Sequence, residues 1–169
     1  MAREDVSTAT TGFWVDRETR QLIVERTFGA PRDLVWKAFT EPERIEKWWG
    51  PREWKTVNKK MEVKPGGVWH YCMTGPDGTE SWGKAVYQEI SPQDRIVYAD
   101  AFSDAEGNTN ESMPTMVITM EFQDLSGRTK VSSVTELASA EQIDSLIGMG
   151  MVQGLSETWD RLEEFLAQS

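Results

Sequence analysis

The chain has 169 residues, 28 acidic against 18 basic side chains, and a net charge of −10. A field of this sign repels phosphates, so it argues against nucleic acids and anionic membranes as sequence-independent partners. The length predicts one domain with a self-sufficient core. Cys72 is the single cysteine, which excludes an internal disulfide. Without an apolar signal core or a run of about 18 apolar residues, the chain is expected to be soluble and cytoplasmic.

The N-terminal region changes character after residue 12. Residues 1–12 are small, polar and rich in threonine, which predicts a disordered arm, followed by a single domain over residues 13–169. The short apolar patch Phe13-Trp14-Val15 fits the edge of a sheet. Residues 20–28 then alternate between two faces, which predicts the first full strand.

Two short helices are predicted after this strand. Proline is favoured in the first turn of a helix, and Pro31 and Pro42 stand where two such turns would begin. Apolar residues at helical spacing extend the first helix over 33–40, and the second covers 41–48. Gly50-Pro51 ends it.

The middle of the chain is divided by turn sequences rich in Gly, Pro, Asn and Asp. Between them lie alternating segments of strand length, whose spacing suits an antiparallel meander. The predicted strands cover 68–74, 81–90, 95–102, 115–122 and 129–137. With the two short helices before them and a helix after them, the class predicted is α+β.

The last thirty residues predict one long amphipathic helix over about 139–165. Its apolar stripe consists of Ile143, Ile147, Met151, Leu155, Trp159, Leu162 and Leu166. Gly148, Gly150 and Gly154 lie within it, although each glycine costs about 1 kcal/mol against alanine inside a helix. We therefore expect either close backbone packing or open space above a groove at these positions.

Several motifs together resemble a known family. The segment from Phe28 to Pro51 resembles the signature opening of the family named for the activator of heat shock protein 90 ATPase, in its single-domain bacterial form, within the START-like or SRPBCC superfamily. The resemblance continues through Pro65-Gly66-Gly67, Trp69, Tyr71, Met73, Pro92 to Tyr98, Asp104 to Asn108, Gly127 to Val131, and Gly150 to Leu162. It covers about residues 20–167.

The resemblance implies the helix-grip fold of the birch-pollen allergen. In that fold a curved antiparallel sheet, here of about six or seven strands, wraps on the long C-terminal helix and leaves a cavity between them. It also implies a link to the stress response. This chain has Met151 where the family often has Trp, so we expect the cavity to differ in shape there.

Large apolar side chains predicted to face inward form the candidate ligand-binding set. They are Trp49, Trp69, Tyr71, Met73, Trp82, Tyr98, Phe102, Met116, Ile118, Met120, Met151 and Leu155, with Trp159 beside them. Trp and Tyr carry polar tips that can orient a ligand in an apolar cleft. The alternative is that these residues simply fill a core.

No catalytic residue, metal site or cofactor is predicted. Alternation along residues 68–74 places His70 and Cys72 on the face opposite Tyr71, which suggests a hydrogen-bonded or partly exposed histidine and a packed cysteine. The acidic turn at 104–111 lacks the register of a calcium loop. Neither a phosphate-binding glycine motif nor a nucleophile elbow occurs.

Three functions are compatible with the sequence. The favoured one is an intracellular binding module, monomer or homodimer, for a small hydrophobic or aromatic molecule. The alternatives are a chaperone-ATPase regulator or other protein-interaction domain, and a cyclase- or hydrolase-like enzyme of the same superfamily. For an enzyme, the polar residues that could reach inward are Arg26, Tyr71, Tyr98, Asp100 and Glu121.

Overall fold

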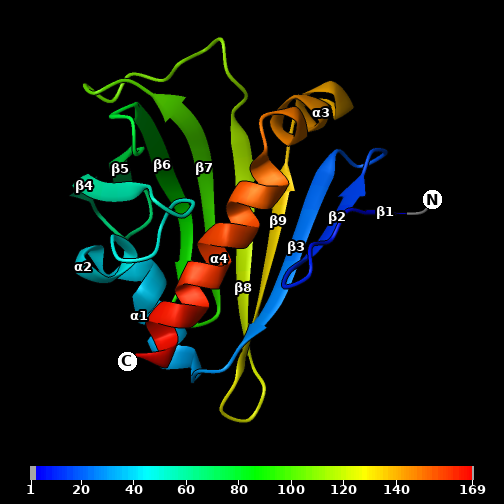
Figure 1. Cartoon of the computed structure of the whole chain (residues 1–169), viewed down its shortest axis with the longest axis vertical. Coiled ribbons are helices and arrows are strands. Elements are labelled where there is room, and N and C mark those ends of the chain that lie inside the picture. The colour runs from blue at the N-terminus through cyan, green and yellow to red at the C-terminus, as the bar shows by residue number, and fades with distance from the viewer. Residues whose placement is uncertain (1–2, 169) are drawn as a thin grey trace.

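The computed structural model describes residues 3–168 as a nine-stranded sheet with four helices (Figure 1). In chain order the elements are β1 (Glu4–Asp5), β2 (Gly12–Asp16), β3 (Gln21–Phe28), α1 (Arg32–Thr40), α2 (Pro42–Ile45), β4 (Lys55–Met61), β5 (Val68–Thr74), β6 (Glu80–Ser91), β7 (Arg95–Ser103), β8 (Met116–Asp124), β9 (Thr129–Glu136), α3 (Ala140–Gly148) and α4 (Met151–Ala167). The predicted α+β class is confirmed, as is a curved antiparallel sheet against the C-terminal helix.

The strand order is β1-β2-β3-β9-β8-β7-β6-β5-β4, with antiparallel neighbours throughout. The meander runs from β4 to β9, and the pairing of β3 with β9 joins the first long strand to the last. Helix α4 crosses one face of this sheet, α1 lies beside its C-terminal end, and α2 lies next to α1 (Figure 1). This arrangement gives the sheet a helix-covered face and an outer face.

The strand count exceeds the predicted six or seven because both edge strands are polar. Strand β4 reads Lys-Thr-Val-Asn-Lys-Lys-Met, and its one aliphatic side chain in mid-strand, Val57, is 63% exposed. Lysines on an edge strand discourage pairing with another chain. They also remove the apolar alternation by which a strand is recognised in a sequence, so β4 escaped prediction.

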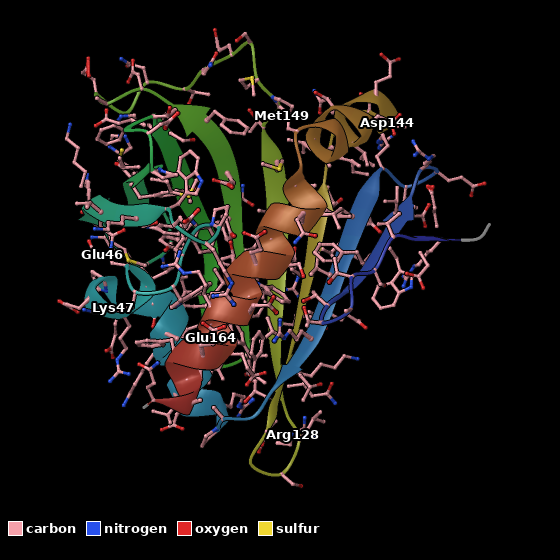
Figure 2. The ribbon with its side chains drawn as sticks, viewed as in Figure 1. Glu46, Lys47, Arg128, Asp144, Met149 and Glu164 are labelled. Carbon is pink, nitrogen blue, oxygen red and sulfur yellow. The ribbon has the colours of Figure 1, made fainter. Side chains whose placement is uncertain are left out.

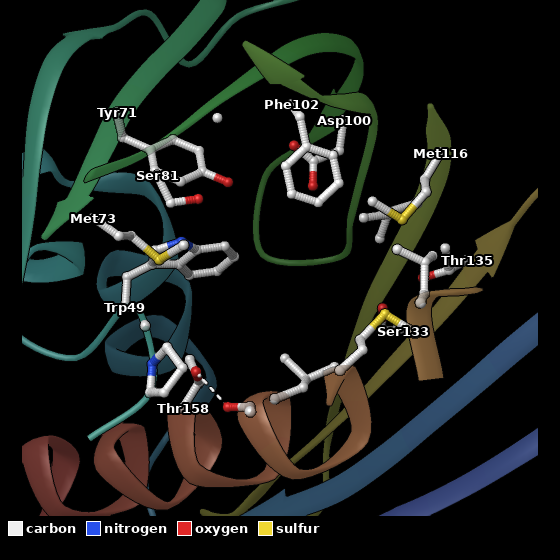
Figure 3. Close-up of a pocket in the computed structure, with 18 of the residues that line it drawn as sticks. Trp49, Tyr71, Met73, Ser81, Asp100, Phe102, Met116, Ser133, Thr135 and Thr158 are labelled. Carbon is white, nitrogen blue, oxygen red and sulfur yellow. Dashed lines mark hydrogen bonds between the residues drawn. The ribbon is translucent and has the colours of Figure 1, made fainter. Parts of the chain in front are cut away.

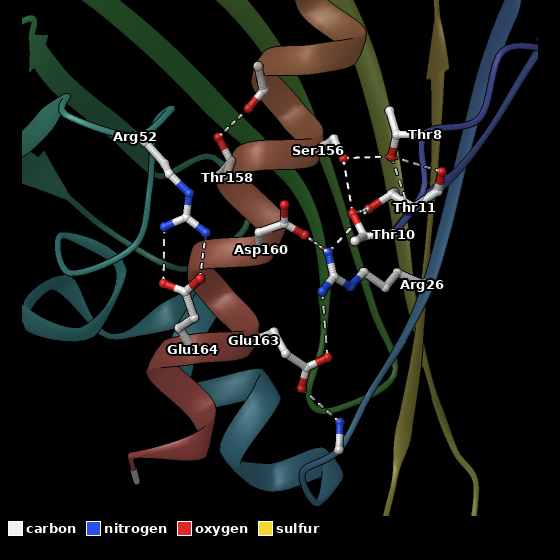
Figure 4. Close-up of polar contacts among 12 residues, drawn as sticks. Thr8, Thr10, Thr11, Arg26, Arg52, Ser156, Thr158, Asp160, Glu163 and Glu164 are labelled. Carbon is white, nitrogen blue, oxygen red and sulfur yellow. Dashed lines mark hydrogen bonds and ion pairs between the residues drawn. The ribbon is translucent and has the colours of Figure 1, made fainter.

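The N-terminal segment also differs from the disordered arm expected over residues 1–12. Residues 1–2 lie outside the described part, but Glu4–Asp5 pairs with β2. The hydroxyls of Thr8 and Thr10 lie 2.7 and 3.2 Å from Ser156 Oγ on α4 (Figure 4). Composition alone could not reveal this order, because its partner lies about 150 residues away in the sequence.

The predicted single C-terminal helix is two helices. Ser139 caps α3 by accepting a hydrogen bond from the Gln142 backbone N–H at 3.2 Å. The chain then breaks at Gly150, whose φ of +87° is a left-handed conformation that only glycine adopts without strain. Helix α4 begins at Met151. The stripe itself is correct, since its C-terminal members Trp159 and Leu162 are 2% and 0% exposed.

Polar contacts fix the C-terminal half of α4 against the rest of the fold. Arg26 on β3 donates to Asp160 Oδ1 at 2.6 Å and lies 3.7 Å from Glu163 (Figure 4). On the other side of the helix, Arg52 makes two hydrogen bonds to the Glu164 carboxylate. Within residues 3–168 no helix combines the length and apolar character needed to cross a bilayer.

Candidate functional site

A pocket of about 350 Å³ lies between the helix-covered face of the sheet and the first half of α4 (Figure 3). Eleven of the twelve predicted residues line it: Trp49, Tyr71, Met73, Trp82, Tyr98, Phe102, Met116, Ile118, Met120, Met151 and Leu155. The register of the sheet explains this gathering. Tyr98 is opposite Ile118, and Met120 is opposite Ile96, so inward positions on neighbouring strands stand side by side.

Two of the predicted residues do not present their rings to the pocket. Trp69 lies behind the wall, stacked on Tyr71 with ring centroids 4.3 Å apart and edge-on to Trp49 at 4.8 Å. Trp82 borders the pocket, but its strand position is opposite Cys72, on the outer face. Its indole packs there against His70, with centroids 5.0 Å apart. The sequence rule that bulky aromatics face inward is therefore wrong for Trp82.

The outer face of the sheet holds His70, the single histidine of the sequence. His70 is 6% exposed, and its Nε2 lies 2.9 Å from the backbone carbonyl of Asp104. Gly107 lies against the same ring. His70 is thus a buried, hydrogen-bonded residue beneath the 104–109 loop, and it does not reach the pocket. Cys72 is buried on the same face.

A small residue shapes the pocket floor. A Cβ built on Gly83 would lie 2.4 Å from Tyr71 Cζ, so the tyrosine ring rests directly on strand β6. Any larger residue would push the ring away. Figure 3 shows the hydroxyls of Tyr71 and Ser81 pointing toward the side of the pocket where Asp100 and Phe102 lie.

Asp100 is the charged group of the site. It is the single acidic or basic side chain among the lining residues that the structure describes. Burial raises its pKa from 3.8 to about 7, opposed by a hydrogen bond from the Ala101 backbone. The residue keeps some accessible surface, yet protein surrounds the carboxyl, so that surface faces the pocket.

The phenols near Asp100 remain neutral. Burial raises the pKa of Tyr71 and of Tyr98 well above 10, and the nearby Asp100 charge raises both further. The same two causes raise the pKa of Tyr87, which packs edge-on to Tyr98 at 6.2 Å. These hydroxyls can donate or accept hydrogen bonds but carry no charge at ordinary pH.

Of the other polar residues proposed to reach inward, Arg26 faces helix α4 but does not line the pocket, and Glu121 does not face inward. Arg26 binds the acidic side chains of α4, as described above. Glu121 is exposed on the outer face, 3.9 Å from Arg95. The sequence missed four hydroxyl residues of the wall: Ser81, Ser133, Thr135 and Thr158. Strand register could have identified two of them, since Ser133 is opposite Met120 and Thr135 is opposite Ile118, both predicted to face inward.

One arginine holds the loop wall of the pocket. Nη1 of Arg161 donates to the carbonyls of Trp49, Gly50, Pro51 and Trp54 at 2.8–3.4 Å. Nη2 donates to the Lys47 carbonyl at 3.2 Å. Burial lowers the pKa of this guanidinium. The side chain thus fixes residues 47–54 against the C-terminal half of α4.

Within residues 3–168, no three His, Cys, Asp or Glu side chains gather in a way that could hold a metal ion. The lining instead consists of apolar side chains, four hydroxyl residues, two phenols and one carboxyl. Such a site suits an organic molecule with a large apolar body and a polar group.

The fold and sequence match other proteins. A family model described as Activator of Hsp90 ATPase homolog 1-like protein matches residues 29–167. A Mycobacterium smegmatis crystal structure is 28% identical, with a TM-score of 0.84 over 91% of this chain and 94% of that one. An Arthrobacter aurescens solution structure is also 28% identical, with a TM-score of 0.87 over 93% and 91%. No protein with a curated description matches.

Proposed function

Because this chain belongs to the family of Activator of Hsp90 ATPase homolog 1-like proteins, we propose that it is a binding module that holds a small, mainly apolar molecule between its sheet and helix α4. The observation that carries this proposal is the pocket of about 350 Å³ and its composition. Ligand sites in proteins usually occupy about 300–1,000 Å³ and combine apolar walls with a few polar groups.

The small residues around the pocket support binding rather than core filling. Gly150 and Gly154 line the pocket; a Cβ on Gly150 would meet no atom within 4 Å, and one on Gly154 would meet only Pro51, at 3.6 Å. Protein interiors are otherwise packed to the density of organic crystals. A helix that keeps Gly154 beside open space forgoes both helix propensity and buried area, and a bound molecule would restore the buried area.

Thermal shift and ligand-observed NMR with neutral aromatic probes, naphthalene and indole, test the proposal. We expect saturable binding that Met151→Trp weakens by at least about tenfold, because the larger ring fills the pocket. The family resemblance makes a tryptophan tolerable at this position. Gln153→Trp, on the exposed side of the same helix, is the matched control and should bind normally. Equal binding by wild type and Met151→Trp, or none by wild type, would contradict the proposal.

A second candidate function, an enzyme, is supported by Asp100. A carboxyl with a pKa near 7 inside an apolar pocket is suited to transfer protons as a general acid or base. The two functions differ in what is recovered after incubation. A binding module returns its ligand unchanged, whereas an enzyme converts it in a way that Asp100→Asn abolishes, and chromatography with mass spectrometry distinguishes them.

The chaperone-regulating role that the resemblance implies stays a prediction. Its test is to titrate the protein into a chaperone and measure the rate of ATP hydrolysis. An unchanged rate at saturating protein would remove this role.

A further inference from the structure

Asp100 stands on the pocket wall without a side-chain partner. Cross-strand pairing places it opposite Ala85 on β6 and Met116 on β8, both on the helix-covered face. Among residues 3–168, no side chain donates a hydrogen bond to its carboxylate, and no cation pairs with it; its one donor is the Ala101 backbone. Buried carboxylates rarely lack a side-chain donor or a cation, because removing an unpaired charge from water costs much free energy.

The surroundings of Asp100 add aromatic faces. Figure 3 shows the rings of Trp49, Tyr71 and Phe102 around the space that Asp100 borders. Aromatic faces attract cations, and the attraction grows when water is excluded. The chain's net charge of −10 also favours the approach of a positive ligand over a negative one.

An ionised carboxylate only accepts hydrogen bonds, so its partner on the ligand must be a donor. Hydrogen bonds between a carboxylate and an ammonium group are about twice as strong as neutral ones. Folding has already removed most water from the Asp100 carboxyl, so binding a cationic ligand adds only the desolvation cost of the ligand. The chemistry therefore favours an ammonium group over a hydroxyl or an amide.

We propose that the pocket selects molecules in which an aromatic or aliphatic body carries a protonated amino group, with the Asp100 carboxylate as the ionic partner of that group. This inference rests on the proposed binding function and adds the chemical class of the ligand. The hydroxyls of Tyr71 and Ser81, which point toward the same side of the pocket, can accept the remaining ammonium hydrogens.

Proton linkage gives a second readout. The titratable groups that face Asp100 from strands β5, β6 and β7 are the phenols of Tyr71, Tyr87 and Tyr98, which stay neutral. The lining residues of α4 and of the loop over 49–51 carry no charge. Since the pKa of Asp100 is about 7, amine affinity should rise between about pH 6 and about pH 8 as this carboxyl ionises.

Calorimetric titration with a matched series tests the inference: tryptamine, tryptophol and indole-3-acetate share one body and differ in the terminal group. At about pH 8 we expect tryptamine to bind about tenfold more tightly than tryptophol, and the carboxylate to bind weakest. Asp100→Asn should remove the preference for the amine and its pH dependence. Glu121→Gln, which removes one charge from the exposed outer face, should keep both.

The outcomes separate this inference from the proposed function. Tryptamine binding no tighter than tryptophol in the wild type, or an amine preference that survives in Asp100→Asn, would overturn the inference. Binding of the neutral probes would still support the pocket as a ligand site in either case. If neither the neutral probes nor the indole series binds, both proposals fail together.

Discussion

The two halves of helix α4 have different environments: the C-terminal half is packed, and the N-terminal half lines the pocket. The C-terminal half buries Trp159, Leu162 and Leu166 and is tied to three separate segments through Arg26, Arg52 and Arg161. The N-terminal half presents glycines and flexible side chains to the pocket. Met149, which precedes the break between α3 and α4, is 55% exposed (Figure 2). One element thus combines a stabilising anchor with a wall that leaves space. Stability and the proposed ligand binding should therefore respond to substitutions in different halves of this helix.

Truncating one leucine in each half should give the largest difference. Leu162→Ala empties a fully buried site and should lower the free energy of unfolding by about 2–5 kcal/mol. Leu155→Ala enlarges a space that already exists and should cost about 1 kcal/mol or less. Urea unfolding at one pH measures both. Equal losses would show that the N-terminal half is packed as tightly as the anchor.

The carboxyl beside the pocket should make stability depend on pH. Its pKa is about 7 in the folded state against 3.8 when unfolded, so the folded state binds the proton more tightly. Stability from this group is complete below about pH 4 and is lost as pH rises through about 7. Asp100→Asn should therefore stabilise the protein by about 2–4 kcal/mol at about pH 8.

At about pH 4 the same substitution should change stability little, because a protonated carboxyl and an amide are both neutral. Glu121→Gln, which removes one charge from the exposed outer face, is the control for the general effect of losing a negative charge. A constant difference between Asp100→Asn and wild type across this range would refute the raised pKa of the buried Asp100 carboxyl.

The glycines around the helix break should give the smallest effects, of opposite sign. Gly148 ends α3 in an ordinary helical conformation with open space around it, so Gly148→Ala should stabilise by about 0.5–1 kcal/mol. Gly150 has the same open space but a φ of +87°, so Gly150→Ala should destabilise by about 1 kcal/mol. Thermal unfolding of both variants is sufficient. The same sign for both would mean that the break is not set by backbone conformation.

The outline of the fold could be predicted from the sequence because strands and helices each leave a repeating apolar pattern among neighbouring residues. Alternation identified β3 and the strands from β5 to β9, and the apolar stripe identified the buried side of the C-terminal region. Pro31 and Pro42 marked the two short helices, although α2 ends at Ile45 rather than at residue 48. These features depend on residues close together in the chain.

What could not be predicted depends on partners far apart in the sequence. The N-terminal hairpin is ordered by Ser156, the helix break by a single backbone angle at Gly150, and the loop wall by Arg161. In the site, alternation gave the facing of Tyr71 and Met120, whereas the rule that bulky aromatics face inward failed for Trp82. That failure has a physical cause, because an aromatic ring can also pack on the outer face, as Trp82 does against His70 and Lys59.

The five carbonyl contacts of Arg161 have a consequence for ligand shape. They hold the loop over 47–54 rigidly, so the pocket cannot widen on that side without breaking several hydrogen bonds at once. Met149 differs from this fixed loop. It lines the pocket but is largely exposed, and it lies beside the start of α4, which has no side-chain cap. We expect the site to reject broad molecules and to tolerate long ones, whose tails extend past Met149 into water.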